Sequence, residues 1–183
     1  MNSNLAMKVE EVLRYDLACG QNCRAEFTGV DLHAPDAAIR WDLTRPWEFA
    51  RSDSVDELHS SHFIEHLTGD EQIHFMNEAY RVLKVGCKLT LITPWWNSVR
   101  FHQDPTHKKA FTDTSGLYYN KPWREANRLT HYPITADFDF TVSYVMTDQR
   151  WMGAAEAARA FAMRYYANVL DDLTIVFIKR PPT

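Results

Sequence analysis

Residues 55–93 constrain the fold more than any other part of this chain. A candidate buried strand at 55–59 enters a Ser-Ser-His turn at 60–62, and a helical period over 68–84 leads to a second candidate buried strand at 88–93. A strand, a helix and a second strand in that order predict a parallel sheet with helices packed on its faces. Ligands bind such sheets beyond the carboxyl ends of the strands, so we expect chemistry at the turn.

The helix after this turn carries clear start and stop signals. Thr68 and Glu71 have the spacing of a capping box, in which the two side chains satisfy open backbone amides. Lys84 suits the negative end of the helix dipole, and Gly86 fits a left-handed stop after it. The apolar face consists of residues that recur at three- and four-residue steps: Ile73, Met76, Tyr80 and Leu83.

The rest of the chain repeats short strands and ends in a strand pair. Strand candidates lie at 9–17, 26–32, 39–43, 138–146 and 173–179, and an alanine-rich helix is predicted over 153–169. Residues 95–135 have no clean period and hold many aromatic side chains, which is typical of a substrate-side lid or insertion. We therefore predict one α/β domain over residues 1–183. Its sheet has seven mostly parallel strands, an antiparallel edge strand and helices on both faces.

Composition narrows the class of protein. A chain of 183 residues with 45% hydrophobic residues suits one globular domain, and a net charge of −4 argues against general polyanion binding. No apolar run approaches the roughly 18 residues of a membrane span. The cysteines Cys19, Cys23 and Cys87 cannot all pair with one another, which favours reduced thiols and the cytoplasm. Cys19 and Cys23 lack a second pair of ligands, so no metal site is expected.

Four segments resemble one protein family. They are 15–20 (YDLACG), 28–31 (TGVD), 56–67 (DELHSSHFIEHL) and 78–94 (EAYRVLKVGCKLTLITP). Together they resemble the class I S-adenosylmethionine-dependent methyltransferases, in the branch called methyltransferase type 11. The resemblance implies a Rossmann-like fold, S-adenosyl-L-methionine as cofactor and S-adenosyl-L-homocysteine as product.

The chain also departs from the family pattern. The family prefers glycine where Ala18 and Asn22 stand, and it places a full helix in the interval between Gly20 and Asp31. We expect that helix to be truncated or replaced by a loop. The N-terminal helices that often cover the cofactor are missing too, which predicts a more open cofactor or a partner subunit over it, so a homodimer stays open.

The resemblance assigns the cofactor contacts. Asp31 would accept hydrogen bonds from the ribose diol, and Asp42 would accept from the adenine amino group beside Leu43. Gly20 would let the backbone approach closely, and Asp16 would reach the cofactor's amino group through water. The full predicted cofactor set is Asp16, Leu17, Ala18, Cys19, Gly20, Asp31, Leu32, Asp42, Leu43, Ser60, Ser61 and His62.

The sulfonium is a good leaving group, so the protein mainly has to align an in-line displacement. If the acceptor is a hydroxyl, a proton must leave, and histidine is the natural base near neutral pH. The candidate bases are His62, His102 and His107, and the candidate substrate contacts are His66, Trp95 and Trp96. A small-molecule acceptor is expected.

Three other interpretations stay open. His62-Phe63-Ile64-Glu65-His66 matches H-x-x-E-H, the signature of a zinc peptidase whose two histidines hold the metal from one helix. A catalytically weak or regulatory domain could retain only the cofactor pocket. Residues 100–131 carry a local charge of +3, from six basic and three acidic residues, which suits an anionic acceptor. Nucleic acid is compatible with that charge but not favoured.

Overall fold

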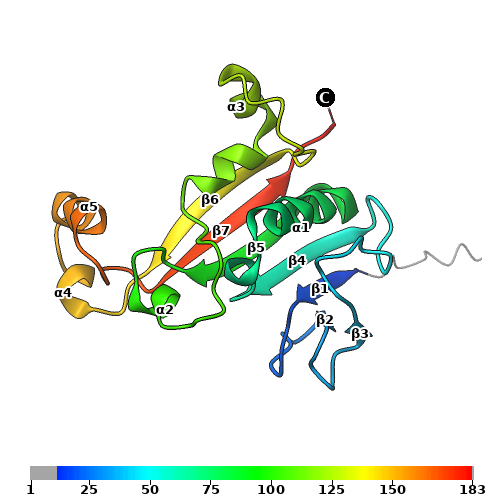
Figure 1. Ribbon diagram of the computed structural model, residues 1–183, viewed down its shortest axis with the longest axis horizontal. Helices are drawn as coiled ribbons and strands as arrows, with labels where there is room; N and C mark the ends of the chain where they lie inside the picture. The colour runs from blue at the N-terminus through cyan, green and yellow to red at the C-terminus, as the bar shows by residue number, and fades with distance from the viewer. Residues whose placement is uncertain (1–11, 183) are drawn as a thin grey trace, which may run out of the picture.

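The computed structural model describes residues 12–182, which form one continuous seven-stranded sheet (Figure 1). The strands are β1 (Arg14–Leu17), β2 (Thr28–Asp31), β3 (Ile39–Arg40), β4 (Val55–Ser61), β5 (Leu83–Pro94), β6 (Phe138–Val145) and β7 (Asp172–Lys179). They lie in the order β3-β2-β1-β4-β5-β7-β6. Neighbours from β3 to β5 are parallel, whereas β7 is antiparallel to β5 and β6. The predicted seven-stranded, mostly parallel sheet is confirmed, with the antiparallel strand one place in from the β6 edge.

The sheet changes its direction of growth beside β1. Strands β2 and β3 extend from one side of β1, and residues 41–54 then carry the chain back to β4 on the other side. Such a reversal opens a crevice at the carboxyl ends of the strands that flank it. The connection at 18–27 contains turns and no helix, as expected from the short interval before Asp31.

Helix α1 (Gly69–Val82) begins at the predicted capping box. The Thr68 side chain accepts from the Glu71 amide, and the Glu71 carboxylate accepts from the Thr68 amide. The predicted end of the helix is wrong, because the fully buried Leu83 already pairs with Val55 as the first residue of β5. Gly86 has a φ of +79° within an irregular stretch of β5 rather than at a helix stop. Sheet pairing thus overrides the local stop signal.

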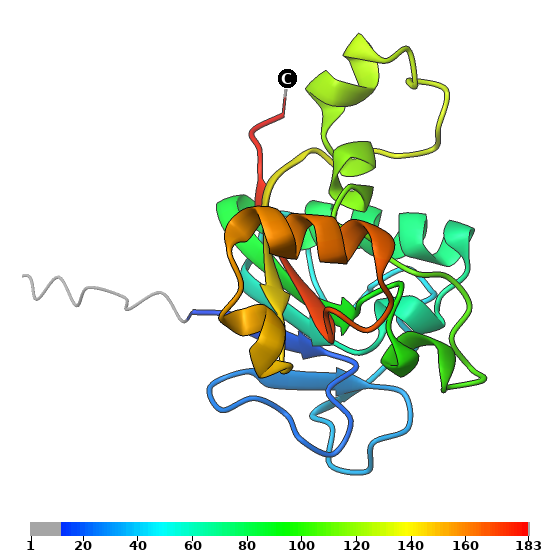
Figure 2. The same ribbon diagram turned by 90° about the vertical axis from the view of Figure 1, so that its left-hand side faces the viewer.

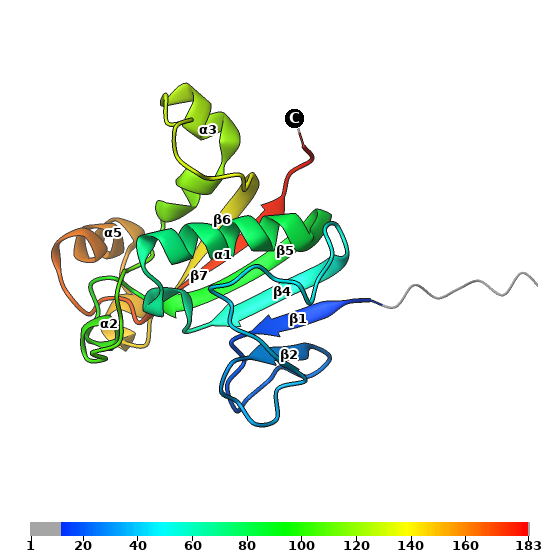
Figure 3. The same ribbon diagram turned by 45° about the vertical axis from the view of Figure 1, so that its right-hand side comes forward.

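Within residues 12–182 the longest helix, α1, covers one face of the sheet, and the opposite face has no comparable cover. In Figures 2 and 3, α1 and α2 (Val99–His102) lie on one side, and no helix covers the opposite side. Along β5 and β7, buried side chains alternate with side chains that are exposed or half-buried. The side chains of Leu89, Leu91, Ile175 and Phe177 are buried, whereas those of Lys88, Thr90, Ile92, Thr174, Val176 and Ile178 are exposed or half-buried. The connections around β1 to β3, at 18–27, 32–38 and 41–54, contain turns and no helix.

Residues 95–135 contribute to the core as well as to the surface. They include α2, the 3-10 helix η2 (Ser115–Tyr119) and α3 (Lys121–Ala126). Phe111 and Tyr119 are buried and stack with ring centroids 6.0 Å apart, and both rings meet Phe177 of β7 edge-on. The aperiodic sequence therefore includes side chains that pack on the same sheet face as α1.

The predicted helix at 153–169 is shorter and is preceded by a separate turn. Helix α4 (Gln149–Met152) ends at Gly153, and α5 (Glu156–Tyr165) ends where Tyr166 takes an extended conformation. Helix α5 crosses the end of the sheet near the carboxyl end of β5 (Figures 1 and 2). No helix within residues 12–182 is long and apolar enough to cross a membrane.

Candidate functional site

A cavity of about 410 Å³ opens at the carboxyl ends of β2, β3 and β4, beside the switch in sheet order. This size suits a small-molecule ligand. We call it the strand-end cavity; its lining residues are Ala18, Asp31, Leu32, His33, Trp41, Asp42, Leu43, Thr44, His62, Phe63, His66, Leu67 and Lys108. A neighbouring hollow of about 560 Å³ shares Leu32, Trp41 and Asp42 with it. The sequence-predicted acids Asp31 and Asp42 thus face one space together with His62.

Asp31 is fixed by backbone amides at the tip of β2. Its Oδ2 accepts from Gly20 N at 2.9 Å, and its Oδ1 accepts from His33 N and Ala34 N at 2.7 and 2.8 Å. Burial alone would raise the pKa of the Asp31 carboxyl, but these three amides outweigh burial and hold it below its usual value. A carboxylate offers about four acceptor positions, so roughly one remains on Oδ2 for a ligand.

The loop after β1 is held in a left-handed conformation. Ala18 has a φ of +55° and Gly20 a φ of +56°, and the Ala18 amide donates to Val30 O at 2.7 Å. Only glycine adopts this conformation without cost, so Ala18 stores roughly 1–2 kcal/mol of strain. The position where the family prefers glycine is therefore one whose backbone conformation favours glycine, and it lines the cavity.

Asp42 and its neighbours in the chain form another part of the wall of the strand-end cavity. Asp42 Oδ1 accepts from Thr44 Oγ1 at 2.7 Å and from Thr44 N at 3.0 Å, and these bonds lower the pKa of the Asp42 carboxyl. Trp41 lines both hollows, and its indole Nε1 donates to Pro46 O at 3.2 Å. Sequence reasoning missed Trp41, although an aromatic residue directly before a predicted site acid was a usable signal.

Several predicted cofactor residues do not line the cavity. Asp16 is buried, with its Oδ1 2.6 Å from His59 Nδ1 and its Oδ2 accepting from Arg24 N at 2.8 Å. This pairing satisfies a carboxylate that would otherwise be costly to bury. Five further residues of the predicted set are also absent from the lining: Leu17 and Ser60, which are buried, and Cys19, Gly20 and Ser61.

The turn after β4 places His62 between two carboxylates. His62 has a φ of +53°, and its amide donates to Ile92 O at 2.8 Å. Its Nδ1 lies 3.5 Å from Glu65 Oε1 and its Nε2 lies 4.0 Å from Asp172 Oδ2. Glu65 first, and then Asp172, raise the pKa of the His62 imidazole above its usual value against the opposing effect of burial.

The H-x-x-E-H segment does not form the helix that a zinc peptidase needs. Residues Ile64–His66 make a single 3-10 turn, η1, and His62 precedes it in a left-handed conformation. The His66 ring instead lies against the ring of His107, with centroids 4.7 Å apart. His102 is exposed on α2 and lines none of the cavities described within residues 12–182.

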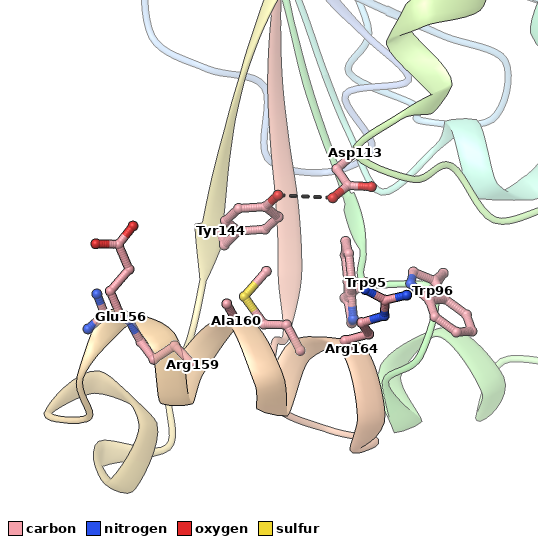
Figure 4. A pocket seen from close by; sticks show the side chains of 9 residues that line it. Trp95, Trp96, Asp113, Tyr144, Glu156, Arg159, Ala160 and Arg164 are labelled. Carbon is pink, nitrogen blue, oxygen red and sulfur yellow. Dashed lines mark hydrogen bonds between the residues drawn. The ribbon is translucent and has the colours of Figure 1, made fainter.

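Trp95 and Trp96 line a different cavity, of about 630 Å³, between the end of β5 and α5 (Figure 4). The Tyr144 hydroxyl donates to Asp113 Oδ2 at 3.0 Å, and burial together with that carboxylate raises the pKa of Tyr144 to about 12. Arg159 and Arg164 complete the wall from α5. The two predicted tryptophans are thus together, but apart from the strand-end cavity.

Comparisons with known proteins identify the fold. No family model and no curated protein matches the sequence. Three solved structures resemble it. A SAM dependent methyltransferase from Archaeoglobus fulgidus matches with a TM-score of 0.65 and 17% identity over 93% of this chain and 87% of that one.

The second is geranyl diphosphate C-methyltransferase from Streptomyces coelicolor, solved with Mg²⁺, geranyl diphosphate and S-adenosyl-L-homocysteine. It has a TM-score of 0.58 and 14% identity over 93% of this chain and 74% of that one. The YcgJ protein from Bacillus subtilis has a TM-score of 0.56 and 14% identity over 94% of both chains. The chain therefore has the Rossmann-like fold of S-adenosylmethionine-dependent methyltransferases.

Proposed function

We propose that this protein is an S-adenosylmethionine-dependent methyltransferase that binds its cofactor in the strand-end cavity. One observation carries the proposal: Asp31, Asp42 and His62 line one cavity at the point where the order of the sheet reverses. Parallel sheets bind ligands at such a point. Solved structures with this fold include one named as a SAM dependent methyltransferase and one that contains S-adenosyl-L-homocysteine.

Each part of the cofactor would have its own partner. The open acceptor position on Asp31 Oδ2 would bind a ribose hydroxyl, and Asp42 with Trp41 would hold the adenine in the hollow that they share with Leu32. His62 would lie near the sulfur. The predicted residues that do not line the cavity, among them Asp16 and Ser60, would support the loop after β1 rather than touch the ligand.

The methyl group would pass to a small-molecule acceptor by in-line displacement. The acceptor's lone pair forms the new bond to carbon as the carbon–sulfur bond breaks and its electrons return to sulfur. Alignment of the two reactants alone can supply on the order of 7–11 kcal/mol of the barrier. The reacting end of the acceptor would lie at His66 in the strand-end cavity, and the rest of the molecule would extend toward Trp95, Trp96 and Arg164, with residues 95–135 as its lid. The free cysteines are consistent with a cytoplasmic location.

Calorimetry with S-adenosyl-L-homocysteine tests the cofactor site. Asp31→Ala removes a charge-assisted hydrogen bond worth about 1.5–3 kcal/mol, so we expect affinity to fall about ten-fold or more. Asp70→Ala, at an exposed carboxylate on α1, serves as the control and should bind like the wild type. Absence of binding by the wild type, or equal binding by Asp31→Ala, would refute the assignment.

A cofactor-binding regulatory domain is the second candidate. The observations in its favour are that Ala18 stands in the left-handed turn after β1, where the family prefers glycine, and that residues 18–27 contain no helix. A single-turnover assay with radiolabelled cofactor and a panel of small hydroxyl and amine acceptors separates the two functions. Label transfer to any acceptor supports the enzyme, whereas tight binding without transfer supports the regulatory domain.

A further inference from the structure

Three potential metal ligands meet beside the strand-end cavity. Glu65 and His66 come from η1, directly after β4, and His107 comes from the loop after α2. One ligand atom from each lies within 4.8 Å of the others. His107 Nε2 is 4.0 Å from Glu65 Oε1. His66 also lines the cavity, so the cluster has an open side.

Glu65 is a buried acid with an unfilled acceptor. The residue is fully buried, and its Oε2 accepts from Thr93 Oγ1 at 3.0 Å. Its Oε1 is buried without a hydrogen-bond partner, although His62 Nδ1 and His107 Nε2 lie 3.5 and 4.0 Å away. An orphaned carboxylate oxygen in the interior is costly unless a cation completes it.

Hydrogen bonds fix the tautomers of both histidines. His107 Nδ1 lies 2.6 Å from Phe101 O, and because a carbonyl only accepts, Nδ1 must donate. Thr106 Oγ1 gives its hydrogen to Asp104 Oδ1, so at 2.9 Å it must accept from His66 Nδ1. Both neutral imidazoles therefore keep the lone pair on Nε2. Metal-binding histidines are oriented by outer partners of this kind.

We infer that Glu65, His66 and His107 bind a divalent transition-metal ion such as Zn²⁺ or Mn²⁺. Two imidazole nitrogens and one carboxylate oxygen favour such ions over Mg²⁺, which prefers oxygen ligands. Metal–ligand distances of about 2.1 Å in a tetrahedral site place ligand atoms about 3.4 Å apart. The 4.0 Å separation between His107 and Glu65 thus needs only a small contraction. Asp104 Oδ2, 3.9 Å from His107 Nε2, adds negative potential.

The ion would bind the acceptor's oxygen, which rests on the methyltransferase function proposed above. Three protein ligands leave coordination positions open toward the cavity. A hydroxyl bound there loses its proton to solvent more readily, because the metal lowers its pKa. The resulting alkoxide forms the carbon–oxygen bond as the carbon–sulfur bond breaks. The electron pair of the carbon–sulfur bond returns to sulfur. The acceptor would accordingly be an alcohol or phenol.

Chelator-treated protein titrated with Co²⁺ alone tests the site. We expect one Co²⁺ per chain with visible d–d absorption. Glu65→Gln and His107→Gln should weaken Co²⁺ binding by more than about 100-fold. This exceeds the loss of metal affinity expected when a residue that only hydrogen-bonds to a ligand is removed. Thr106→Val removes only the orienting contact to His66 and should weaken it by roughly ten-fold. His131→Gln, at an exposed histidine outside the cluster, is the matched control and should bind like the wild type.

The outcomes separate this inference from the proposed function. Absence of Co²⁺ binding by the wild type, or equal binding by both ligand variants, would overturn the metal site and leave His62 as the neighbour of Glu65. His107→Gln keeps the test valid if the buried Glu65 variant does not fold. Calorimetry with S-adenosyl-L-homocysteine on the same samples should show retained binding, and its failure would count against the cofactor site alone.

The open coordination positions have their own readout. Acetohydroxamate, a bidentate oxygen donor, should change the d–d spectrum of the Co²⁺-loaded wild type. An unchanged spectrum would exclude acceptor binding at the ion.

Discussion

The two halves of the sheet are built differently. The long-strand half, β4, β5, β7 and β6 with α1, has strands of 7, 12, 8 and 8 residues. The short-strand half comprises β1, β2 and β3, of 4, 4 and 2 residues, with the connections 18–27, 32–38 and 41–54. One half is mostly regular backbone, and the other is mostly turns.

The difference separates stability from ligand binding. An aromatic cluster around Phe177 and the buried face of α1 pack in the long-strand half. Eight of the thirteen residues that line the strand-end cavity come from the short-strand half. Regions with few regular hydrogen bonds open locally at low free energy, and binding sites are drawn from them. The comparison predicts that the two halves respond to different perturbations.

Phe177→Ala should have the largest effect. Phe177 is fully buried, and its ring contacts those of Phe111, Tyr119 and Phe138. Truncation of such a residue should lower the free energy of unfolding by about 3–5 kcal/mol in urea titrations. Phe161→Ala on α5, where the side chain is 54% exposed, should cost far less. Similar losses for the two variants would show that Phe177 is not part of the stabilising core.

Features that depend on residues close together in the chain could be predicted from the sequence. The capping box at Thr68 and Glu71 is local, and it formed as expected. Asp31, Asp42 and His62 line one cavity because parallel strands end at the same edge, so placing each residue at a strand end was enough.

The sequence could not predict what distant contacts decide. Leu83 joins β5 because Val55 is there to pair with it, against the local helix signal. His107 lies near Glu65 because the backbone amides of Lys108 and Lys109 donate to the Glu65 carbonyl. No residue spacing in the sequence indicates these hydrogen bonds.

The proposed product should stabilise mainly the short-strand half. At 100 times its dissociation constant, S-adenosyl-L-homocysteine should add about 2.7 kcal/mol to the free energy of unfolding. Hydrogen exchange should then slow in residues 18–27 and 32–44, because the ligand holds these turns closed. Amides of β5 and β7 should change only through global unfolding. Protection that is confined to β5 and β7 would contradict the division between the halves.

A smaller effect is expected from Thr68→Ala. The change removes the side chain that accepts from Glu71 N, and loss of such a cap costs about 1 kcal/mol. Thr68 does not line the strand-end cavity, so the affinity for S-adenosyl-L-homocysteine should stay unchanged. Thr135→Ala is the control. Thr135 lies outside the cavity and caps no helix within residues 12–182. A fall in ligand affinity equal to the fall in stability would mean that the halves are energetically one unit.

The last prediction concerns Glu78, which links the two halves. Its Oε2 accepts from Trp47 N, in the 41–54 connection, at 2.6 Å and from Arg81 Nη2 on α1 at 2.8 Å. Burial opposes ionisation, but Arg81 and the Trp47 amide outweigh it and lower the pKa of Glu78 below its ordinary value. A carboxyl whose pKa is lower in the folded state stabilises the fold above its unfolded pKa, about 4.3. That contribution is lost as the pH falls through the folded pKa.

Glu78→Gln should therefore lower stability at pH 7 and remove part of the decline that the wild type shows below about pH 4.5. Urea midpoints measured at steps from pH 7 to pH 3 give both results, with the exposed Glu156→Gln as control. Because Glu78 joins the 41–54 connection to α1, the variant should also weaken cofactor binding slightly through the wall at Trp41 and Asp42. A pH profile identical to the wild type would remove Glu78 as an electrostatic link and leave the pairing of β1 with β4 and the packing of the fully buried Trp47 as contacts between the halves.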